Sequence, residues 1–213
     1  MTGSDSKVLI AMFLPFLIVI GVLIIFGVIA YLRRQARQQA WSELAGRTGL
    51  TFEPGGIFSP MVVTGTYRGH NLTLDTFTRS SGKSSTTYTR IRLTVENPSA
   101  LSLAIYDENV FSKIGKALGM QDVQVGDEDL DRRFIIKGQP EHVIASLLTS
   151  SSLRQKLPEA RSVHVEVKGQ ELRFEQRGAE SNADYAQFLF DLLSDLVEAV
   201  DHTGGGARAA WER

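Results

Sequence analysis

Three aspartates at alternating positions are the residues of this sequence with the clearest chemical potential. Asp127, Asp129 and Asp131 match the first half of a calcium loop, in which oxygen ligands at odd positions converge on a hard cation. The second half does not match, because Arg132 replaces the required glycine and Gly138 replaces the required glutamate. The carboxylates could also serve a metal-dependent hydrolase, although no nucleophile is recognisable beside them. We expect a structural role in a polar turn.

Other signatures of catalysis or ligand binding are absent from the sequence. It has no cysteine and four histidines, and no two histidines have the spacing of zinc ligands. Gly82-Lys83-Ser84 resembles the end of a phosphate-binding loop, but Phe77 stands where that loop needs its first glycine. The signatures of serine hydrolases, metalloproteases and dinucleotide-binding proteins do not occur. We therefore predict a protein that is not an enzyme and binds no metal or cofactor.

The uncharged run of residues 8–32 is the longest apolar segment of the sequence, and the rest of the chain is attached to it. As a helix, its 25 residues would measure about 37 Å, which exceeds the roughly 30 Å hydrocarbon core of a bilayer. The run is too long for a cleaved signal peptide, and it ends at Leu32, before Arg33, without a small-residue cleavage site. We predict a retained transmembrane helix that follows a tail of residues 1–7.

Basic residues at the two ends of this run predict its orientation. Lys7 precedes the run, whereas Arg33, Arg34 and Arg37 follow it. The positive-inside rule then places the N-terminus outside the cell and the rest of the chain in the cytoplasm. We expect residues 33–49 to form a juxtamembrane helix that holds the three arginines near the lipid headgroups, where each can gain about 1 kcal/mol from anionic lipid. They are candidate membrane-surface contacts, as binding groups or only as markers of topology.

Residues 50–201 have the composition of one ordinary globular domain. The chain is 43% hydrophobic and 22% charged, with a formal net charge of −1. About 165 residues outside the apolar run suffice to bury one core. The near-neutral charge and the lack of a basic stripe argue against nucleic acid as a partner. Residues 202–213 are expected to form a flexible tail.

Hydrophobic periodicity predicts an α+β fold of antiparallel hairpins covered by helices. The alternating segments expected to be strands are 61–67, 72–77, 88–95, 101–106, 134–136, 163–167 and 172–175, with a turn over 79–85. The segments expected to be helices are 110–118, 140–148, 153–157 and 182–201. The last helix has an acidic side, which we expect either to be solvated or to bind a basic partner; it consists of Asp184, Asp191, Asp195, Glu198 and Asp201.

One stretch of the soluble part resembles a known family. The run GDEDLDRRFIIKGQPEHVIASLLTSSSLRQKL, residues 126–157, looks like the core of a bacterial family of membrane-anchored proteins of unknown function, with a G-D-x-x-F/L-D-x-x-F-x-V segment before a short helix. Residues 41–45 and 67–69 extend the resemblance loosely over 41–200. It implies the anchored architecture, and it implies no catalytic residues because the family has no established activity.

These features predict a single-pass membrane protein that presents a cytoplasmic domain for interaction or scaffolding. Two other classes of function remain open. The first is a module that binds lipid headgroups or a small ligand through the three arginines after the anchor. The second is a metal-dependent hydrolase that uses the acidic segment 127–131.

Overall fold

The computed structural model describes residues 3–56, 59–82, 84–107 and 122–204, with no side-chain description for residues 3–12 and 151. The helix expected over 110–118 lies outside the described residues, as does most of the tail expected over 202–213.

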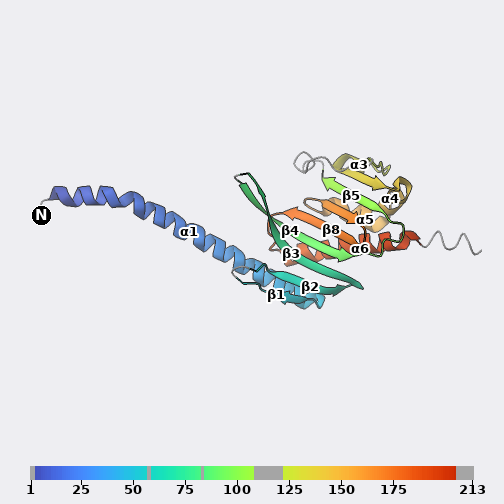
Figure 1. Ribbon diagram of the computed structural model, residues 1–213, viewed down its shortest axis with the longest axis horizontal. Coiled ribbons are helices and arrows are strands. Elements are labelled where there is room, and N and C mark those ends of the chain that lie inside the picture. Colours follow the sequence, from blue (N-terminus) through green and yellow to red (C-terminus); the bar gives the residue numbers. More distant parts are fainter. Residues whose placement is uncertain (1–2, 57–58, 83, 108–121, 205–213) are drawn as a thin grey trace, which may run out of the picture.

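A single helix, α1 (Gly3–Thr48), joins the apolar run to the folded domain (Figure 1). Its 46 residues measure about 69 Å at 1.5 Å per residue. From Phe13 onward it is long and apolar enough to cross a membrane, as judged by length and composition. The expected transmembrane and juxtamembrane helices are therefore one continuous element, which also includes residues 3–7.

The last turns of α1 belong to the core of the folded domain. Trp41 and Leu44 are fully buried, and Ala40 and Ala45 are nearly so. The indole Nε1 of Trp41 donates a 3.0 Å hydrogen bond to the carbonyl oxygen of Glu180. Since the same helix carries the apolar run and these core residues, the run cannot turn relative to the domain without bending α1.

The folded domain is built on one sheet of eight strands, in the order β1-β2-β3-β4-β8-β7-β5-β6. All neighbouring strands pair antiparallel. The strands are β1 (Thr51–Glu53), β2 (Val62–Tyr67), β3 (His70–Ser81), β4 (Ser84–Thr94), β5 (Ser102–Asp107), β6 (Phe134–Gln139), β7 (His164–Lys168) and β8 (Glu171–Arg177). The expected α+β class with antiparallel hairpins is confirmed.

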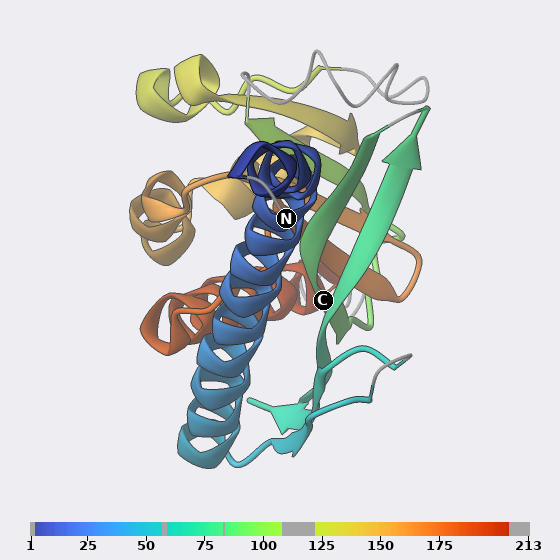
Figure 2. The same ribbon diagram turned by 90° about the vertical axis from the view of Figure 1, so that its left-hand side faces the viewer.

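Helices cover one face of this sheet (Figure 2). They are the end of α1 and the elements α3 (Glu128–Arg133), α4 (Glu141–Leu148), α5 (Ser151–Lys156) and α6 (Ala183–Asp201), with short 3₁₀ turns η1 (Leu157–Glu159) and η2 (His202–Gly204). The sheet residues that face these helices include one row of directly opposed, buried apolar side chains: Val63, Leu74, Ile91, Phe174, Val165, Ile105 and Ile136. This row crosses seven strands and forms the centre of the core.

Three local features differ from the expectations. The strand β1 was not expected, because its three residues are too few to show a period. β3 and β4 continue through most of the segment expected to be a turn, since serine and threonine pair there in a ladder that ends at Ser81 and Ser84. The polar turn expected before β6 contains the short helix α3.

The acidic side of α6 binds the domain itself. Arg68 donates to Asp195 at 2.6 Å and to Glu198 at 3.0 Å. The hydroxyl of Tyr67 donates to Asp191 at 2.7 Å. Asp201 accepts a 2.8 Å hydrogen bond from the backbone N–H of Glu96. Most of the side that was expected to be solvated or to bind a basic partner is therefore already occupied, because the β2–β3 turn brings Arg68 against α6.

Candidate functional site: the charged face of the sheet

The face of the sheet turned away from the helices carries charged and aromatic side chains. These alternate along each strand with the residues of the covered face. We call this surface the charged face; it consists of Asp75, Phe77, Arg79, Tyr88, Arg90, Arg92, Tyr106, His164, Glu166, Lys168, Arg173, Glu175 and Arg177. Within the described part of the chain, the helices gather on the opposite side (Figure 2).

A bidentate ion pair joins β3 and β4 on the charged face. Asp75 is only 7% exposed and stands directly opposite Arg90 in the ladder. Arg90 donates from Nε to Oδ1 at 2.9 Å and from Nη2 to Oδ2 at 2.7 Å. The Nη2 of Arg92 lies 3.3 Å from Oδ2. The hydrogen bonds with Asp75 raise the pKa of Arg90, and they compensate a carboxylate whose burial would otherwise be costly.

Glu175 is the second buried carboxylate of this face, with 5% exposure. Arg79 donates from Nη2 to its Oε2 at 3.0 Å. The Nε of Arg173 and the Nδ1 of His164 each lie 3.6 Å from a Glu175 oxygen. Because β4 separates β3 from β8, the Arg79 side chain must pass over β4 to reach Glu175. The charges of three strands are therefore linked across the surface.

Glu166 connects the network to the β5 side of the sheet. His164 Nε2 lies 3.2 Å from Oε1, the hydroxyl of Tyr106 donates to the same oxygen at 3.1 Å, and Arg173 pairs with Oε2. The hydrogen bond with His164, aided by Arg173, lowers the pKa of Glu166 to about 2. Burial, reinforced by the charge of Glu166, raises the pKa of Tyr106 to about 12. Glu166 is thus held as a carboxylate and Tyr106 as a neutral phenol at neutral pH.

An aromatic pair lies beside these charges on the β3–β4 hairpin. The rings of Phe77 and Tyr88 are stacked, with centroids 5.4 Å apart. The guanidinium of Arg79 lies 5.4 Å from the Phe77 centroid and 5.1 Å from the Tyr88 centroid. Arg90 lies 5.0 Å from the Phe77 centroid. These cation–π contacts hold two arginines of the charged face in fixed positions.

The charged face is suited to recognition by complementary charge. Its buried carboxylates have arginine partners, and its cations and anions are fixed in place by one another. Within the described residues, no group of three or more histidine and acidic side chains is placed to hold a metal ion. A surface with arginines, carboxylates and aromatic rings in fixed positions favours a polar partner whose charges are complementary, because each charge of the partner must lie opposite one of the other sign.

The three aspartates singled out from the sequence have separate contacts in the structure. Asp127 is the N-cap of α3 and accepts from the backbone N–H groups of Asp129 and Leu130 at 3.0 and 3.2 Å. These bonds, led by that of Leu130, lower the pKa of Asp127. Arg154 forms an ion pair with the same carboxylate.

The other two aspartates point to different surroundings. Asp131 accepts from the N–H groups of Val125 and Gly126 at 2.9 and 3.0 Å. The side chain of Asp129 is 88% exposed and lies 3.9 Å from Arg132. The carboxylates of Asp127 and Asp131 therefore organise the backbone around α3, and this arrangement supports the structural interpretation.

The three arginines after the apolar run differ in their surroundings. Arg33 is exposed to solvent. Arg34 donates from Nη2 to the carbonyl oxygen of Gly56 at 3.0 Å. Arg37 is half-buried, burial lowers its pKa with Arg34 as a second cause, and its Nε has no partner in the described structure. Only Arg33 is wholly available to a membrane surface, whereas Arg34 also ties α1 to the connection between β1 and β2.

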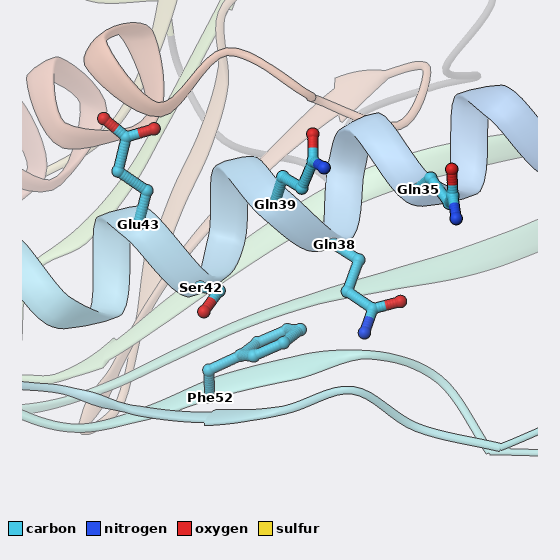
Figure 3. A pocket seen from close by; sticks show the side chains of 6 residues that line it. All are labelled: Gln35, Gln38, Gln39, Ser42, Glu43 and Phe52. Carbon is cyan, nitrogen blue, oxygen red and sulfur yellow. The ribbon is translucent and has the colours of Figure 1, made fainter.

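A shallow groove runs between α1 and β1 just beyond these arginines. It has a volume of about 520 Å³ and is lined by Gln35, Gln38, Gln39, Ser42, Glu43 and Phe52. Figure 3 shows Gln38 and Ser42 on the side of the helix that faces the Phe52 ring. The groove is open and its walls are largely polar, which distinguishes it from the enclosed apolar pockets that usually hold small ligands.

Comparisons with known proteins add a fold relationship. No family model and no curated protein matches the chain. Among solved structures, the chain is similar to the crystal structure of the mycobacterial trehalose monomycolate transport factor A, TtfA, with a TM-score of 0.51 and 10% sequence identity. The match covers 76% of this chain and 94% of the TtfA chain. At this identity the likeness shows a shared fold, and the motif that resembles an uncharacterised bacterial family has no matching family model.

Proposed function

We propose that this chain is a membrane-anchored binding protein without catalytic activity, which presents the charged face to another protein at the membrane. α1 supplies the anchor, and the sheet domain supplies the binding surface. The fold shared with TtfA is in keeping with this role, since that protein is described as a transport factor. The domain lies in the cytoplasm in this proposal, as the distribution of basic residues around the apolar run predicts.

One observation carries the proposal: the charged face has fixed, partly buried charges on the side of the sheet where no described helix lies. Asp75 and Glu175 have little solvent contact, and each is paired with arginine side chains that compensate its burial. A purely solvated face would need no such order, because exposed charges contribute little to stability. The burial of the last turns of α1 in the core then keeps this face at a constant orientation to α1.

Charge reversal at the rim of the charged face tests the proposal. Lys168 and Arg177 are exposed and can be replaced by glutamate without breaking the buried pairs. The full-length chain should capture a membrane-associated protein after cross-linking in cells, and Lys168→Glu with Arg177→Glu should abolish that capture. Gln155→Glu on α5, on the helix-covered side, is the matched control and should leave the capture intact. Equal capture by all three chains would overturn the assignment of the charged face.

Cysteine accessibility tests the orientation. The natural sequence has no cysteine, so a single Gln155→Cys variant carries one reactive thiol. A membrane-impermeant maleimide should label this variant only after the cells are permeabilised. Labelling of intact cells would place the domain on the outer side and contradict the proposed location.

A further inference from the structure

One end of the folded domain is marked by the exit of α1 toward the apolar run, and we call it the anchor end. The hydrogen bond from Arg34 to the Gly56 carbonyl holds the β1–β2 connection there. Figure 1 shows the tip of the β3–β4 hairpin at the same end, pointing back along α1 toward its apolar part. The β2–β3 and β7–β8 turns lie at the opposite end, as the alternation of antiparallel strands requires.

The β3–β4 hairpin extends beyond its neighbours at the anchor end. β2 pairs with β3 only as far as Asp75, and β8 pairs with β4 only as far as Thr89, with one further bridge from Gly178 to Tyr88. The ladder between β3 and β4 continues to Ser81 and Ser84. From Phe77 to Ser81 the two-stranded ribbon advances about 13 Å, at roughly 3.3 Å per residue. A ribbon of two strands is marginal in water without support, so its length calls for an explanation.

Side chains at the base stiffen this ribbon and hold its direction. The stacked Phe77 and Tyr88 rings form a cross-strand pair, and Arg79 lies over both rings while its Nη2 reaches Glu175. The ribbon is thereby tied to β8 through a buried carboxylate. It is held as a fixed projection toward the end of the domain from which α1 leaves.

We propose that the ends of β3 and β4 at the hairpin tip, residues 80–81 and 84–85, form a second membrane contact, which rests on the lipid headgroups beside the point where α1 enters the bilayer. The occupant is the bilayer surface itself, and the contact is continuous with the one made by α1. Ser80, Ser81, Ser84 and Ser85 are exposed, and their hydroxyls can donate to phosphate oxygens of lipid headgroups. For three of them this donation replaces long hydrogen bonds within the hairpin, from Ser84 Oγ to the Ser81 carbonyl oxygen at 3.2 Å and between Ser80 Oγ and Ser85 Oγ at 3.4 Å. The tip is hydroxyl-rich and has no large apolar side chain among these residues, so it rests on the headgroup layer without entering the hydrocarbon.

The second contact has a mechanical consequence. A single helix leaves a domain free to rotate about the helix axis and to tilt relative to the bilayer. Two contacts separated across the anchor end fix both angles. This inference rests on the proposed insertion of α1 in a membrane, and the experiment below reports the two events separately.

Fluorescent labelling at single cysteines tests the second contact. The cysteine-free chain allows an NBD fluorophore to be attached at Ser81→Cys or Ser84→Cys in the full-length protein. The labelled protein is reconstituted in vesicles of phosphatidylcholine and phosphatidylglycerol that contain a lipid with a nitroxide on its headgroup. We expect the nitroxide to quench both tip labels strongly. A Gln170→Cys label in the exposed β7–β8 turn, at the opposite end of the sheet, is the matched control and should keep its emission.

A fourth label separates failure of the hairpin contact from failure of the anchor. Ile24→Cys lies within the apolar run of α1 and should be shielded from an aqueous quencher when the helix spans the bilayer. If the Ile24 label is shielded and the tip labels are quenched no more than the Gln170 label, the hairpin contact is overturned while the anchor stands. If the Ile24 label is open to the aqueous quencher, both are overturned. Replacement of phosphatidylglycerol by phosphatidylcholine should preserve the quenching, since neutral headgroups also offer phosphate acceptors.

Discussion

The two faces of the sheet are formed by the same strands but bury their side chains in different ways. On the covered face, a row of apolar side chains crosses the sheet and packs under α1 and α6. On the charged face, the residues between them form a lattice of arginines and carboxylates. Phe174 and Glu175 are neighbours in sequence and are almost equally buried, at 0% and 5% exposure. The comparison shows that burial alone does not identify the core, because one face excludes water by packing and the other by pairing charges.

Truncation on the covered face should have the largest effect. Phe174→Ala leaves a cavity in the central row, and we expect a loss of about 3–5 kcal/mol in the free energy of unfolding. Urea unfolding followed by circular dichroism in detergent measures this loss, as α1 is retained. If Phe174→Ala lowered the free energy of unfolding no more than a substitution of an exposed residue, such as Gln155→Ala, Phe174 would not lie at the centre of the core.

Breaking the ion pair of Asp75 on the charged face should lower the free energy of unfolding by less than the truncation of Phe174. Asp75→Ala leaves Arg90 and Arg92 without their carboxylate, and we expect a loss of about 1–3 kcal/mol, since both arginines keep partial contact with water. The double variant with Arg90→Ala should lose less than the sum of the two single variants. Strict additivity of the two losses would mean that the pair contributes nothing to the lattice.

Acid should weaken the charged face before it weakens the covered face. The pKa of Glu166 is lowered to about 2 in the folded chain, so the folded state binds its proton less readily than the unfolded state. The resulting stabilisation is complete above the ordinary glutamate pKa and is lost as the pH falls from about 5 toward 2. Glu166→Gln should flatten the dependence of the unfolding free energy on pH in this window. An unchanged slope would contradict the assignment.

The smallest effects on stability are expected from substitutions in the acidic segment 127–131, whose carboxylates belong to neither face of the sheet. Asp127→Ala removes the N-cap of α3 and should lower Tm slightly, whereas Asp129→Ala should leave Tm unchanged because its side chain is solvated. Calcium or magnesium should not raise Tm of the natural chain. A rise in Tm that is lost in Asp129→Ala would instead support the metal-dependent hydrolase.

The sequence predicted the covered face better than the charged face. The alternation of residues such as Val63, Leu72 and Leu74 is a local pattern, and it located the hairpins and the α+β class. The charged face depends on pairs such as Arg79 with Glu175, which are 96 residues apart and come together only through the strand order. Arg90 and Arg92 lie in segment 88–95, which was expected to be a strand, but no local signal identified Asp75 as their partner.

Two further features lay beyond the sequence for similar reasons. The acidic side of α6 was expected to be solvated or to bind a basic partner, because the position of Arg68 against Asp195 is set by tertiary packing and leaves no local signal. The serine-rich ends of β3 and β4 were expected to form a turn. Residues in a projecting ribbon are polar on both faces, so they lack the alternation of apolar and polar residues that indicates a strand with one buried face. Local patterns thus located the elements, and the contacts between elements decided the candidate site.

Site-specific photo-cross-linking tests most directly whether the charged face is the binding surface. A photo-reactive phenylalanine analogue is placed in the full-length chain at Lys168 or Arg177 on the charged face, and at Ser146 or Gln155 on the helix-covered side. All four positions are exposed. Irradiation of cells should give a cross-linked protein partner from the first two positions and none from the other two. Cross-links from Ser146 and Gln155, with none from Lys168 and Arg177, would contradict the account.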